Sequence, residues 1–382
     1  MIRVLHSVSN MDRGGVETML MNYYRHIDRT QVQFDFLCNK KKPGHYDEEI
    51  RSMGGRIFRT PGLNPVRYPL YLTYMRALFQ KYPEYKIVEA HNGPFGVYAL
   101  YAAKKNGVPH RIFHAHGASL IKDKKYLLKL FCKCRIEAVS NHYFTCGVEA
   151  SKFYFSEQIN QEQSYVLIPN AINLSAFRFQ PTLRNKLRVQ YNLSDQKVIG
   201  HIGRFMSQKN HTFLIDIFHA LYQTDTSYHL VLLGEGELMG HIQAKVTALG
   251  IQDAVTFVGN VANANEWYQA FDLFLLPSLF EGLPVVGIEA AAAGLPCVYS
   301  KTITREVQLS PRTVFVGLDE PVSTWVQKIQ SMIESPDLEL CDDGYELMRG
   351  KGYELIRNHG YDIQNEAKKL EDIYLKYMRN VH

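Results

Sequence analysis

Cysteine is scarce in this 382-residue sequence, and its six cysteines form no Cys-x-x-Cys pair. That spacing argues against a zinc ribbon and a disulfide framework, and it favours a reducing compartment. No run of about 18 consecutive apolar residues occurs, so no transmembrane helix is expected. The N-terminus lacks a basic start followed by an apolar stretch, so no signal peptide is expected either. We therefore predict a cytoplasmic protein.

Acidic residues are underrepresented in the first half of the chain. Residues 1–175 contain 24 Lys and Arg against 14 Asp and Glu, whereas the whole chain has a net charge of +5. This asymmetry indicates that the first half meets something anionic, such as a nucleic acid or a membrane surface. A slightly basic domain without a special partner is the alternative.

Short apolar runs alternate with amphipathic segments along the sequence, which is typical of a parallel α/β architecture. One series of expected strands runs from Ile2–His6 to His142–Cys146. A second series runs from Val198–His201 to Pro296–Tyr299. Two such series at this length predict two domains rather than one.

The expected domains are Rossmann-like and doubly wound, at residues 1–172 and 173–360, and face each other across a cleft. The amphipathic stretch 361–382 is expected to be a helix that packs back on the first domain. Ligands of open α/β sheets bind beyond the carboxyl ends of the strands. The main candidate motifs follow such strands directly.

A glycine pair, Gly14 and Gly15, lies between the first strand and a helix. Glycine lets backbone N–H groups approach an anion closely, and the helix N-terminus adds partial positive charge. The pair could instead serve only to reverse the chain.

Arg204 and Lys209 follow the expected strand Val198–His201. A planar guanidinium and a compact ammonium group five residues later could together neutralise a diphosphate leaving group. Surface ion pairs are the alternative for each cation.

The segment FEGLPVVGIEA carries two glutamates, Glu281 and Glu289, eight residues apart. A helix is expected to begin near Leu283 or Pro284, with Glu281 in the preceding loop and Glu289 inside the helix. Amide groups near Leu283 could bind a phosphate, while Glu289 could hold a ribose and Glu281 a transferred sugar. N-capping for Glu281 and a solvated helix face for Glu289 are the alternatives.

Three glycines have nearly the spacing of a dinucleotide-binding fingerprint: Gly234, Gly236 and Gly240. The third glycine falls one residue late, so nicotinamide binding is not indicated. A loop that approaches a nucleotide at Gly234 stays open as an interpretation.

Histidines end two expected strands, with His91 after one, and His114 and His116 at the other. His116 precedes Gly117 and is expected to line a cleft, whereas His91 and His114 are more typical of polar core residues. Two alternate histidines without a carboxylate at ligand spacing make a poor metal site. No Asp-x-Asp motif occurs, so no metal is expected.

Residues 122–135 form a candidate basic amphipathic helix. Its lysines recur at three- and four-residue steps and would share a face: Lys122, Lys125, Lys129 and Lys133. Such a helix could lie on anionic lipid, which would make the protein peripheral to the inner face of the cell membrane. A surface helix whose leucines pack on the sheet is the alternative.

Together these motifs resemble the retaining glycosyltransferases of GT-B fold called family four, especially the capsular and exopolysaccharide biosynthesis members. The segments GGVET, IPNAIN, GRFMSQKN, LGEGEL and EGLPVVGIEAAAAGLPCV occur in the family's order and cover nearly the whole chain. The paired-glutamate segment is the most specific of them. Ala171 departs from the glycine common in the family's PNG element.

The resemblance implies a transferase that works without a metal or other cofactor. It would move a hexose or N-acetylhexosamine from a UDP-sugar donor to a glycan acceptor that is lipid-linked, and no nucleic acid partner is expected. It implies catalytic roles for Glu281, His116, Arg204 and Lys209. A further set is implied in donor binding: Gly15, Gly234, Leu283, Glu289 and Asn170.

Two other functions remain open from the sequence. A UDP-sugar 2-epimerase has the same architecture and would convert the donor without an acceptor. A non-catalytic anion- or membrane-binding protein would suit the basic first half, but it leaves Glu281, Arg204 and Lys209 without a shared purpose.

Overall fold

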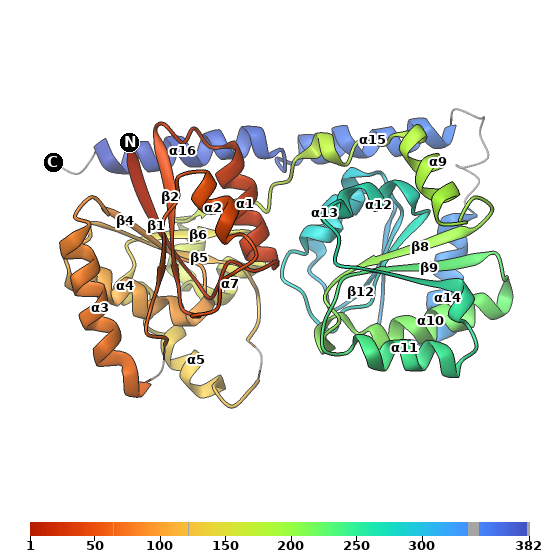
Figure 1. Cartoon of the computed structure of the whole chain (residues 1–382), viewed down its shortest axis with the longest axis horizontal. Coiled ribbons are helices and arrows are strands. Elements are labelled where there is room, and N and C mark those ends of the chain that lie inside the picture. The colour runs from red at the N-terminus through yellow and green to blue at the C-terminus, as the bar shows by residue number, and fades with distance from the viewer. Residues whose placement is uncertain (64, 121, 335–343, 380–382) are drawn as a thin grey trace. The chain divides into compact units, whose positions relative to one another are not determined.

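The computed structural model describes residues 1–379 except residues 64, 121 and 335–343. Its contacts divide the chain into two compact units. The first comprises residues 1–171 and the segment that begins at Ile363, and the second comprises residues 172–362. Each unit is an α/β domain built on one parallel sheet (Figure 1).

The first unit contains a seven-stranded parallel sheet with the strand order β3-β2-β1-β4-β5-β6-β7. Strand β2 is buried along its whole length, as expected of a strand covered on both faces. The strands are β1 (Ile2–Val8), β2 (Val32–Cys38), β3 (Ile57–Arg59), β4 (Ile87–Ala90), β5 (His110–Ala115), β6 (His142–Thr145) and β7 (Val166–Leu167).

Helices cover this sheet, and the C-terminal helix belongs to the same unit. Helix α16 packs against α1, β1 and β2 through apolar residues such as Ile363, Leu370 and Tyr374. The helices are α1 (Gly15–His26), α2 (Asp47–Ser52), α3 (Tyr68–Lys81), α4 (Gly96–Lys105), α5 (Tyr126–Lys133), α6 (Ile136–Val139), α7 (Val148–Tyr154), α8 (Glu157–Gln161) and α16 (Ile363–Arg379).

The second unit contains a six-stranded parallel sheet with the strand order β10-β9-β8-β11-β12-β13. Its apolar core includes Leu230 and Leu275 from the strands and Phe218 and Trp325 from the helices. The strands are β8 (Lys197–Ile202), β9 (Tyr228–Leu233), β10 (Val255–Gly259), β11 (Leu273–Leu276), β12 (Cys297–Ser300) and β13 (Thr313–Val316).

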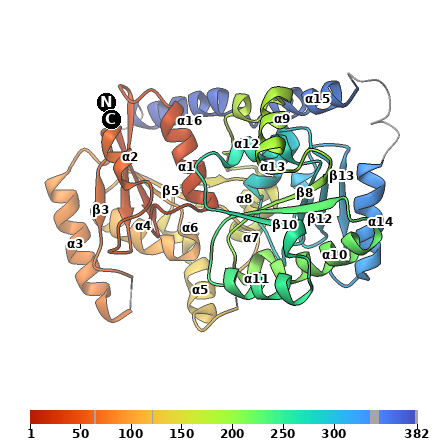
Figure 2. The ribbon, with the colours of Figure 1, turned by 45° about the vertical axis from the view of Figure 1, so that its right-hand side comes forward.

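Helices lie on both faces of the second sheet, with α10, α11 and α14 on one face and α9, α12 and α13 on the other (Figure 2). The helices are α9 (Pro181–Gln190), α10 (His211–Thr224), α11 (Met239–Ala248), α12 (Ala264–Ala270), α13 (Val285–Ala292), α14 (Val322–Ile333) and α15 (Gly344–Asn358). The prediction of two Rossmann-like domains is therefore confirmed.

Both sheets change direction at one point in their strand order. The chain proceeds outward from β1 to β3, then returns to place β4 beside β1, and the second sheet repeats this with β8 and β11. Ligands of such sheets bind at the carboxyl ends of the two strands that flank this switch point. The loops after β8 and β11 contain Arg204, Lys209 and Glu281.

Candidate functional site

The loop after β8 is held by backbone contacts to its neighbour. The Gly203 N–H donates to the Leu233 carbonyl at 2.9 Å, and the Phe205 N–H donates to the Glu235 carbonyl at 2.9 Å. Phe205 is fully buried, whereas Arg204 between these two residues is exposed. The loop therefore anchors itself through its backbone and Phe205 and leaves the Arg204 guanidinium available at the carboxyl edge.

Gly234 and Gly236 are required by the close approach of this neighbouring loop. A Cβ at Gly234 would lie 2.2 Å from the Gly203 carbonyl oxygen, and Gly234 has a φ of +128°. A Cβ at Gly236 would lie 2.4 Å from the Phe205 carbonyl oxygen. These glycines thus pack two loops together, which accounts for their spacing without a dinucleotide.

Glu281 lies at the centre of a polar cluster that joins the loops after β8 and β11. The Lys209 Nζ lies 2.7 Å from Glu281 Oε1, and the two side chains are 14% and 9% exposed. Gln208 Nε2 donates to Glu281 Oε2 at 3.0 Å, and Ser278 Oγ donates to Oε1 at 2.9 Å. A charged hydrogen bond shielded from water is stronger than one on the surface.

This cluster shows that Glu281 does not act as an N-cap. Helix α13 begins at Val285, its N-cap residue is Pro284, and no side-chain cap bond is formed there. The carboxylate of Glu281 instead has three donors, and one of them is a cation at the strand switch point. A lysine and a glutamate held together in this way can present a cation to a phosphate and an acceptor to a hydroxyl group.

Glu289 lies in the second turn of α13 and is not on a solvated helix face. The Tyr268 hydroxyl donates to Glu289 Oε2 at 2.7 Å, and Tyr268 itself is buried. Burial raises the pKa of Glu289 from 4.5 to about 7. A carboxylate with this pKa is half ionised near neutral pH, and a ligand that donates hydrogen bonds to it will favour the ionised form.

Sequence reasoning missed three side chains of this site: Gln208, Ser278 and Tyr268. Gln208 lies in the same SQKN segment as Lys209, and Ser278 follows the end of β11, so their positions beyond strands were available as a signal. Tyr268 comes from α12, and only the packing of α12 against α13 brings it to Glu289.

The predicted residues of the first unit lie at the carboxyl edge of its own sheet or beyond β7. Gly15 is the first residue of α1, and a Cβ built on it would meet no atom within 4 Å. His116 follows β5 and is half-buried, while Asn170 is buried after β7. The open space beside Gly15 at a helix N-terminus suits the close approach of an anion.

Four histidines and one glutamate form a cluster at the centre of the first sheet, and all of them except the half-buried His116 are buried. Among the described residues, two groups have ligand atoms close enough to hold a metal ion: His91, His114 and His116, and His6, Glu89 and His91. Hydrogen bonds join these side chains, while the buried His6 Nε2 and His114 Nε2 have no hydrogen-bond partner in the described part of the chain. His91 uses both ring nitrogens, with His6 at 3.0 Å and His116 at 2.9 Å.

The basic segment differs from its prediction. Helix α5 begins only at Tyr126, because Asp123 forms a turn in which its side chain accepts from the Lys125 N–H at 2.9 Å. Lys122 therefore lies outside the helix, and the prediction that it shares one helical face with the other three lysines is wrong. Lys125 is the N-cap residue, and its carbonyl accepts from the Lys129 N–H at 2.9 Å.

The remaining two lysines of the segment are engaged with neighbouring side chains. Lys129 forms an ion pair with Asp123 at 2.9 Å, and the Lys133 ammonium lies 4.1 Å from the centre of the Phe153 ring. Leu127 and Phe131, one helical turn apart, are 79% and 59% exposed. The prominent feature of α5 is thus an exposed apolar pair, flanked by the exposed Lys125.

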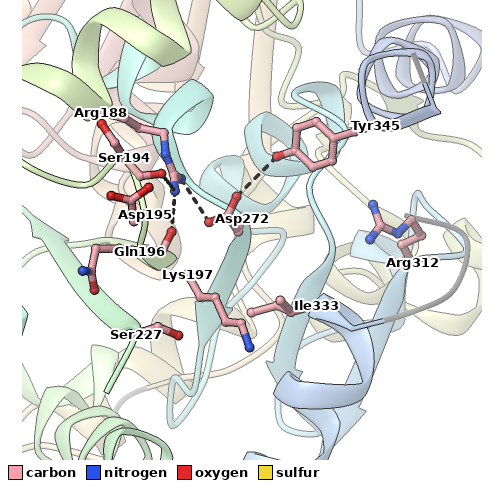
Figure 3. Close-up of a pocket in the computed structure, with 10 residues that line it drawn as sticks. All are labelled: Arg188, Ser194, Asp195, Gln196, Lys197, Ser227, Asp272, Arg312, Ile333 and Tyr345. Carbon is pink, nitrogen blue, oxygen red and sulfur yellow. Dashed lines mark hydrogen bonds and ion pairs between the residues drawn. The ribbon is translucent and has the colours of Figure 1, made fainter. Parts of the chain in front are cut away.

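A cavity of about 380 Å³ lies at the opposite edge of the second sheet (Figure 3). It is lined by residues that precede strands, among them Gln196, Ser227 and Asp272. Its polar groups bond to one another: Arg188 Nη1 donates to Asp272 Oδ2 at 3.0 Å, and Tyr345 donates to Oδ1 at 3.4 Å. These contacts tie strand beginnings to helices, so we assign them a structural role.

Comparison with known proteins identifies the family of this chain. The family profile described as Glycosyltransferase Family 4 matches residues 13–176, and that described as Glycosyl transferases group 1 matches residues 196–335. EpsF of Bacillus subtilis (strain 168), a protein named as a glycosyltransferase, is 36% identical over 332 residues, which cover 86% of each chain. The chain belongs to the GT-B glycosyltransferases.

Two further similarities extend the comparison. The Escherichia coli UDP-Gal:alpha-D-GlcNAc-diphosphoundecaprenol alpha-1,3-galactosyltransferase is 24% identical over 308 residues, or 75% of this glycosyltransferase and 76% of that enzyme. The crystal structure of HepE from Anabaena in complex with UDP-glucose superimposes with a TM-score of 0.79 at 16% identity. It covers 98% of this chain and all of that one, and it supports the fold.

Proposed function

We propose that this glycosyltransferase moves a hexose or N-acetylhexosamine from a UDP-sugar to a glycan acceptor with retention of anomeric configuration. The observation that carries the proposal is the Lys209–Glu281 pair, which stands at the switch point of the second sheet with Glu289 on the following helix. A cation for the diphosphate, an acceptor for the sugar and an acceptor for the ribose are the three groups that a sugar nucleotide requires.

In this mechanism, Arg204 and Lys209 stabilise the negative charge that grows on the departing diphosphate. The bond between the anomeric carbon and the diphosphate oxygen breaks, and the acceptor oxygen bonds to that carbon on the same face. The acceptor's proton passes to the leaving phosphate oxygen. Charge stabilisation of the leaving group would then be the largest catalytic contribution.

The remaining residues are assigned to contacts with the same sugar-nucleotide donor. Glu289 binds the ribose hydroxyls, Glu281 and His116 contact the transferred sugar, and backbone amides at Gly15 and near Leu283 complete the phosphate cradle. Gly234 and Asn170 lie in segments that border it in the proposed complex.

The acceptor that we propose is a lipid-linked glycan in capsular or exopolysaccharide synthesis. The support comes from relatives: the Escherichia coli enzyme is named for a diphosphoundecaprenol-linked acceptor, and a Salmonella typhi relative over 26% of this chain is named for Vi polysaccharide biosynthesis. We propose a cytoplasmic location at the inner face of the membrane.

A panel of UDP-, GDP- and dTDP-sugars with lipid-linked acceptors tests the reaction. We expect transfer from a UDP-sugar, with product of retained configuration by NMR. No transfer and no nucleotide release with any donor would contradict the proposal, and so would conversion of the donor without an acceptor, which is the reaction of an epimerase.

Metal independence is tested in the same assay by chelation. We expect the turnover rate to stay within about twofold after EDTA treatment, because Arg204 and Lys209 supply the positive charge that a metal provides elsewhere. Loss of transfer in EDTA and its recovery with a divalent cation would contradict this expectation and direct attention to the histidine cluster.

The pKa of Glu289 predicts how donor affinity depends on pH. Ribose hydroxyls donate to the ionised carboxylate, so UDP-glucose should bind more tightly as the pH rises through about 7 and reach a plateau above it. UDP-glucose is the suitable probe because its diphosphate is esterified at both ends, so the ligand itself does not change its charge between pH 6 and 8. Titration calorimetry from pH 6 to 8 measures the effect, and Glu289→Gln should remove it.

Folding stability should respond to Glu289 in the opposite direction. The folded carboxyl group retains its proton to about pH 7, whereas its ordinary pKa is 4.5, so its contribution to stability is lost as the pH rises through that window.

An affinity profile for Glu289→Gln identical to that of the unmodified protein would contradict the ribose assignment.

Membrane attachment is proposed to use the exposed pair Leu127 and Phe131. No helix among the described residues is long and apolar enough to cross a bilayer. The double variant Leu127→Gln, Phe131→Gln should lose most of its binding to vesicles containing anionic phospholipid, measured by sedimentation. The control is Val189→Gln, which changes an apolar residue that is 69% exposed on α9. Equal binding by both variants would contradict the assignment.

A further inference from the structure

A chain of histidines connects His116 to the interior of the first sheet. The His116 Nε2 lies 2.9 Å from the His91 Nδ1, and the His91 Nε2 lies 3.0 Å from the His6 Nδ1. His6 and His91 are buried, whereas His116 is half-buried at the carboxyl edge. Strands β1, β4 and β5 are neighbours in the sheet, which is why residues 85 and 25 positions apart meet here.

The Glu89 carboxylate contacts this chain of histidines. Its Oε1 lies 2.8 Å from the His114 Nδ1 and 3.4 Å from the His91 Nε2, and the Tyr374 hydroxyl donates to its Oε2 at 2.5 Å. Tyr374 comes from α16, so the C-terminal helix closes the network. Burial raises the pKa of Glu89, whereas the hydrogen bond from Tyr374 lowers it. All three partners can donate to a carboxylate, so we take the ionised form of Glu89 as the one that satisfies them together.

The protonation of the three histidines follows from this arrangement. Burial lowers the pKa of His91 and His116 well below 6.5 and that of His6 to about 4, so each ring is neutral and carries one N–H. We assign the His91 proton to Nε2, because this nitrogen faces both the Glu89 carboxylate and the His6 Nδ1. The His6 Nδ1 then accepts, and His6 carries its own proton on Nε2, which is buried and has no hydrogen-bond partner within the described residues.

The His91 Nδ1 is then an acceptor, and His116 must donate to it from Nε2. The other ring nitrogen of His116, Nδ1, has no hydrogen-bond partner among the described residues and carries a lone pair. His116 therefore offers an acceptor for a hydroxyl group, which is the group that a sugar presents in greatest number.

We propose that His91 is a positioning residue that fixes the ring orientation and the tautomer of His116, so that the His116 Nδ1 accepts a hydrogen bond from a sugar hydroxyl. The inference rests on the proposed function, because it assigns the purpose of His91 through the donor-sugar contact of His116. Glu89 and Tyr374 set the direction of the chain of hydrogen bonds. The His6 Nδ1 accepts from the His91 Nε2 at the buried end of the chain.

Four variants of the full chain test the inference by steady-state kinetics: His91→Leu, His91→Asn, His116→Ala and the double variant His91→Leu, His116→Ala. Asparagine places an oxygen near the position of the His91 Nδ1, whereas leucine has a similar size and no acceptor. The donor is the sugar nucleotide of the panel above that gives the fastest transfer. The control His241→Leu changes an exposed histidine on α11.

We expect His91→Leu to lower kcat by about 10- to 100-fold, with His91→Asn close to the unmodified protein, since small misplacement of a catalytic group has effects of this size. His91→Leu should have little further effect once His116 is alanine, because the two act as one unit. Equal losses in the Leu and Asn variants, or losses that multiply in the double variant, would overturn the inference.

The outcomes separate this inference from the proposed function. Normal turnover of His116→Ala would contradict the sugar contact itself, whereas impaired His116→Ala with normal His91→Leu would overturn only the positioning role. Nitrogen-15 NMR of labelled histidines, with the His116 signal identified by its loss in His116→Ala, reports the tautomer without relying on folding of the His91 variants. We expect a proton on His116 Nε2, and a proton on Nδ1 would overturn the inference.

Discussion

Replacing Glu281 with glutamine lowers the turnover number by about 10²–10³ and leaves the affinity for UDP within a few-fold, if Glu281 contacts the transferred sugar. Glutamine keeps the size of the side chain and removes its charge. Lys209, Gln208 and Ser278 all bond to the carboxylate in the present structure, so the variant also weakens the cluster that holds it in place. UDP lacks the sugar and should therefore be insensitive to the change.

The experiment pairs turnover with calorimetric titration of UDP. Glu346→Gln, an exposed position on α15, is the matched control and should behave as the unmodified protein. Normal turnover of Glu281→Gln would show that the site is wrongly assigned. A loss of UDP affinity as large as the loss of turnover would place Glu281 at the nucleotide and not at the sugar.

Replacing Lys209 with methionine should weaken both donor binding and transfer, because we propose that the ammonium group faces the diphosphate before and during its departure. We expect kcat/KM to fall by about 10²–10³ and UDP to bind more weakly. Methionine retains the length of the side chain, while Gln208 and Ser278 continue to donate to Glu281, so the fold should persist.

Two comparisons test the specificity of that effect. Lys186→Met removes an exposed cation from α9 and should change neither quantity. Raising the salt concentration should reduce UDP affinity in the unmodified protein more than in Lys209→Met, since one charge contact is already absent. An unchanged UDP affinity in Lys209→Met would contradict the diphosphate assignment.

The sequence was sufficient to predict the elements that carry the strongest periodicity. Strands β1, β6, β8 and β12 overlap the apolar runs that predicted them, and helix α16 lies in the amphipathic stretch at the C-terminal end. The strands β7 and β13, each at an edge of its sheet, were missed. Strand β7 has only two residues, which is too few to give an apolar signal.

The sheet edge that carries the candidate site could be predicted, but the contacts within the candidate site could not. Glycine-rich and charged loops after strands indicate the carboxyl edge from sequence alone. The contact between Lys209 and Glu281 joins positions 72 residues apart, and it requires β8 and β11 to be neighbours. The same reason hides His6, a residue inside a strand, whose role depends on β4 lying beside β1.

A local turn explains why the basic segment differs from its prediction. The spacing of Lys122, Lys125, Lys129 and Lys133 fits a helix, but Asp123 accepts from the Lys125 N–H and delays the start of α5 to Tyr126. A side chain that bonds to its own backbone competes with helix formation. Periodicity alone does not register that competition.

Titration calorimetry of the full chain and four variants with UDP-glucose tests whether four side chains of the candidate site bind one sugar nucleotide. We expect one bound nucleotide sugar per chain, with weaker binding in Arg204→Met, Lys209→Met, Glu289→Gln and Glu281→Gln. All four substitutions should weaken the binding of that one nucleotide sugar. No heat of binding with UDP-glucose or any other nucleoside diphosphate sugar, or the same dissociation constant in all five proteins, would contradict this expectation.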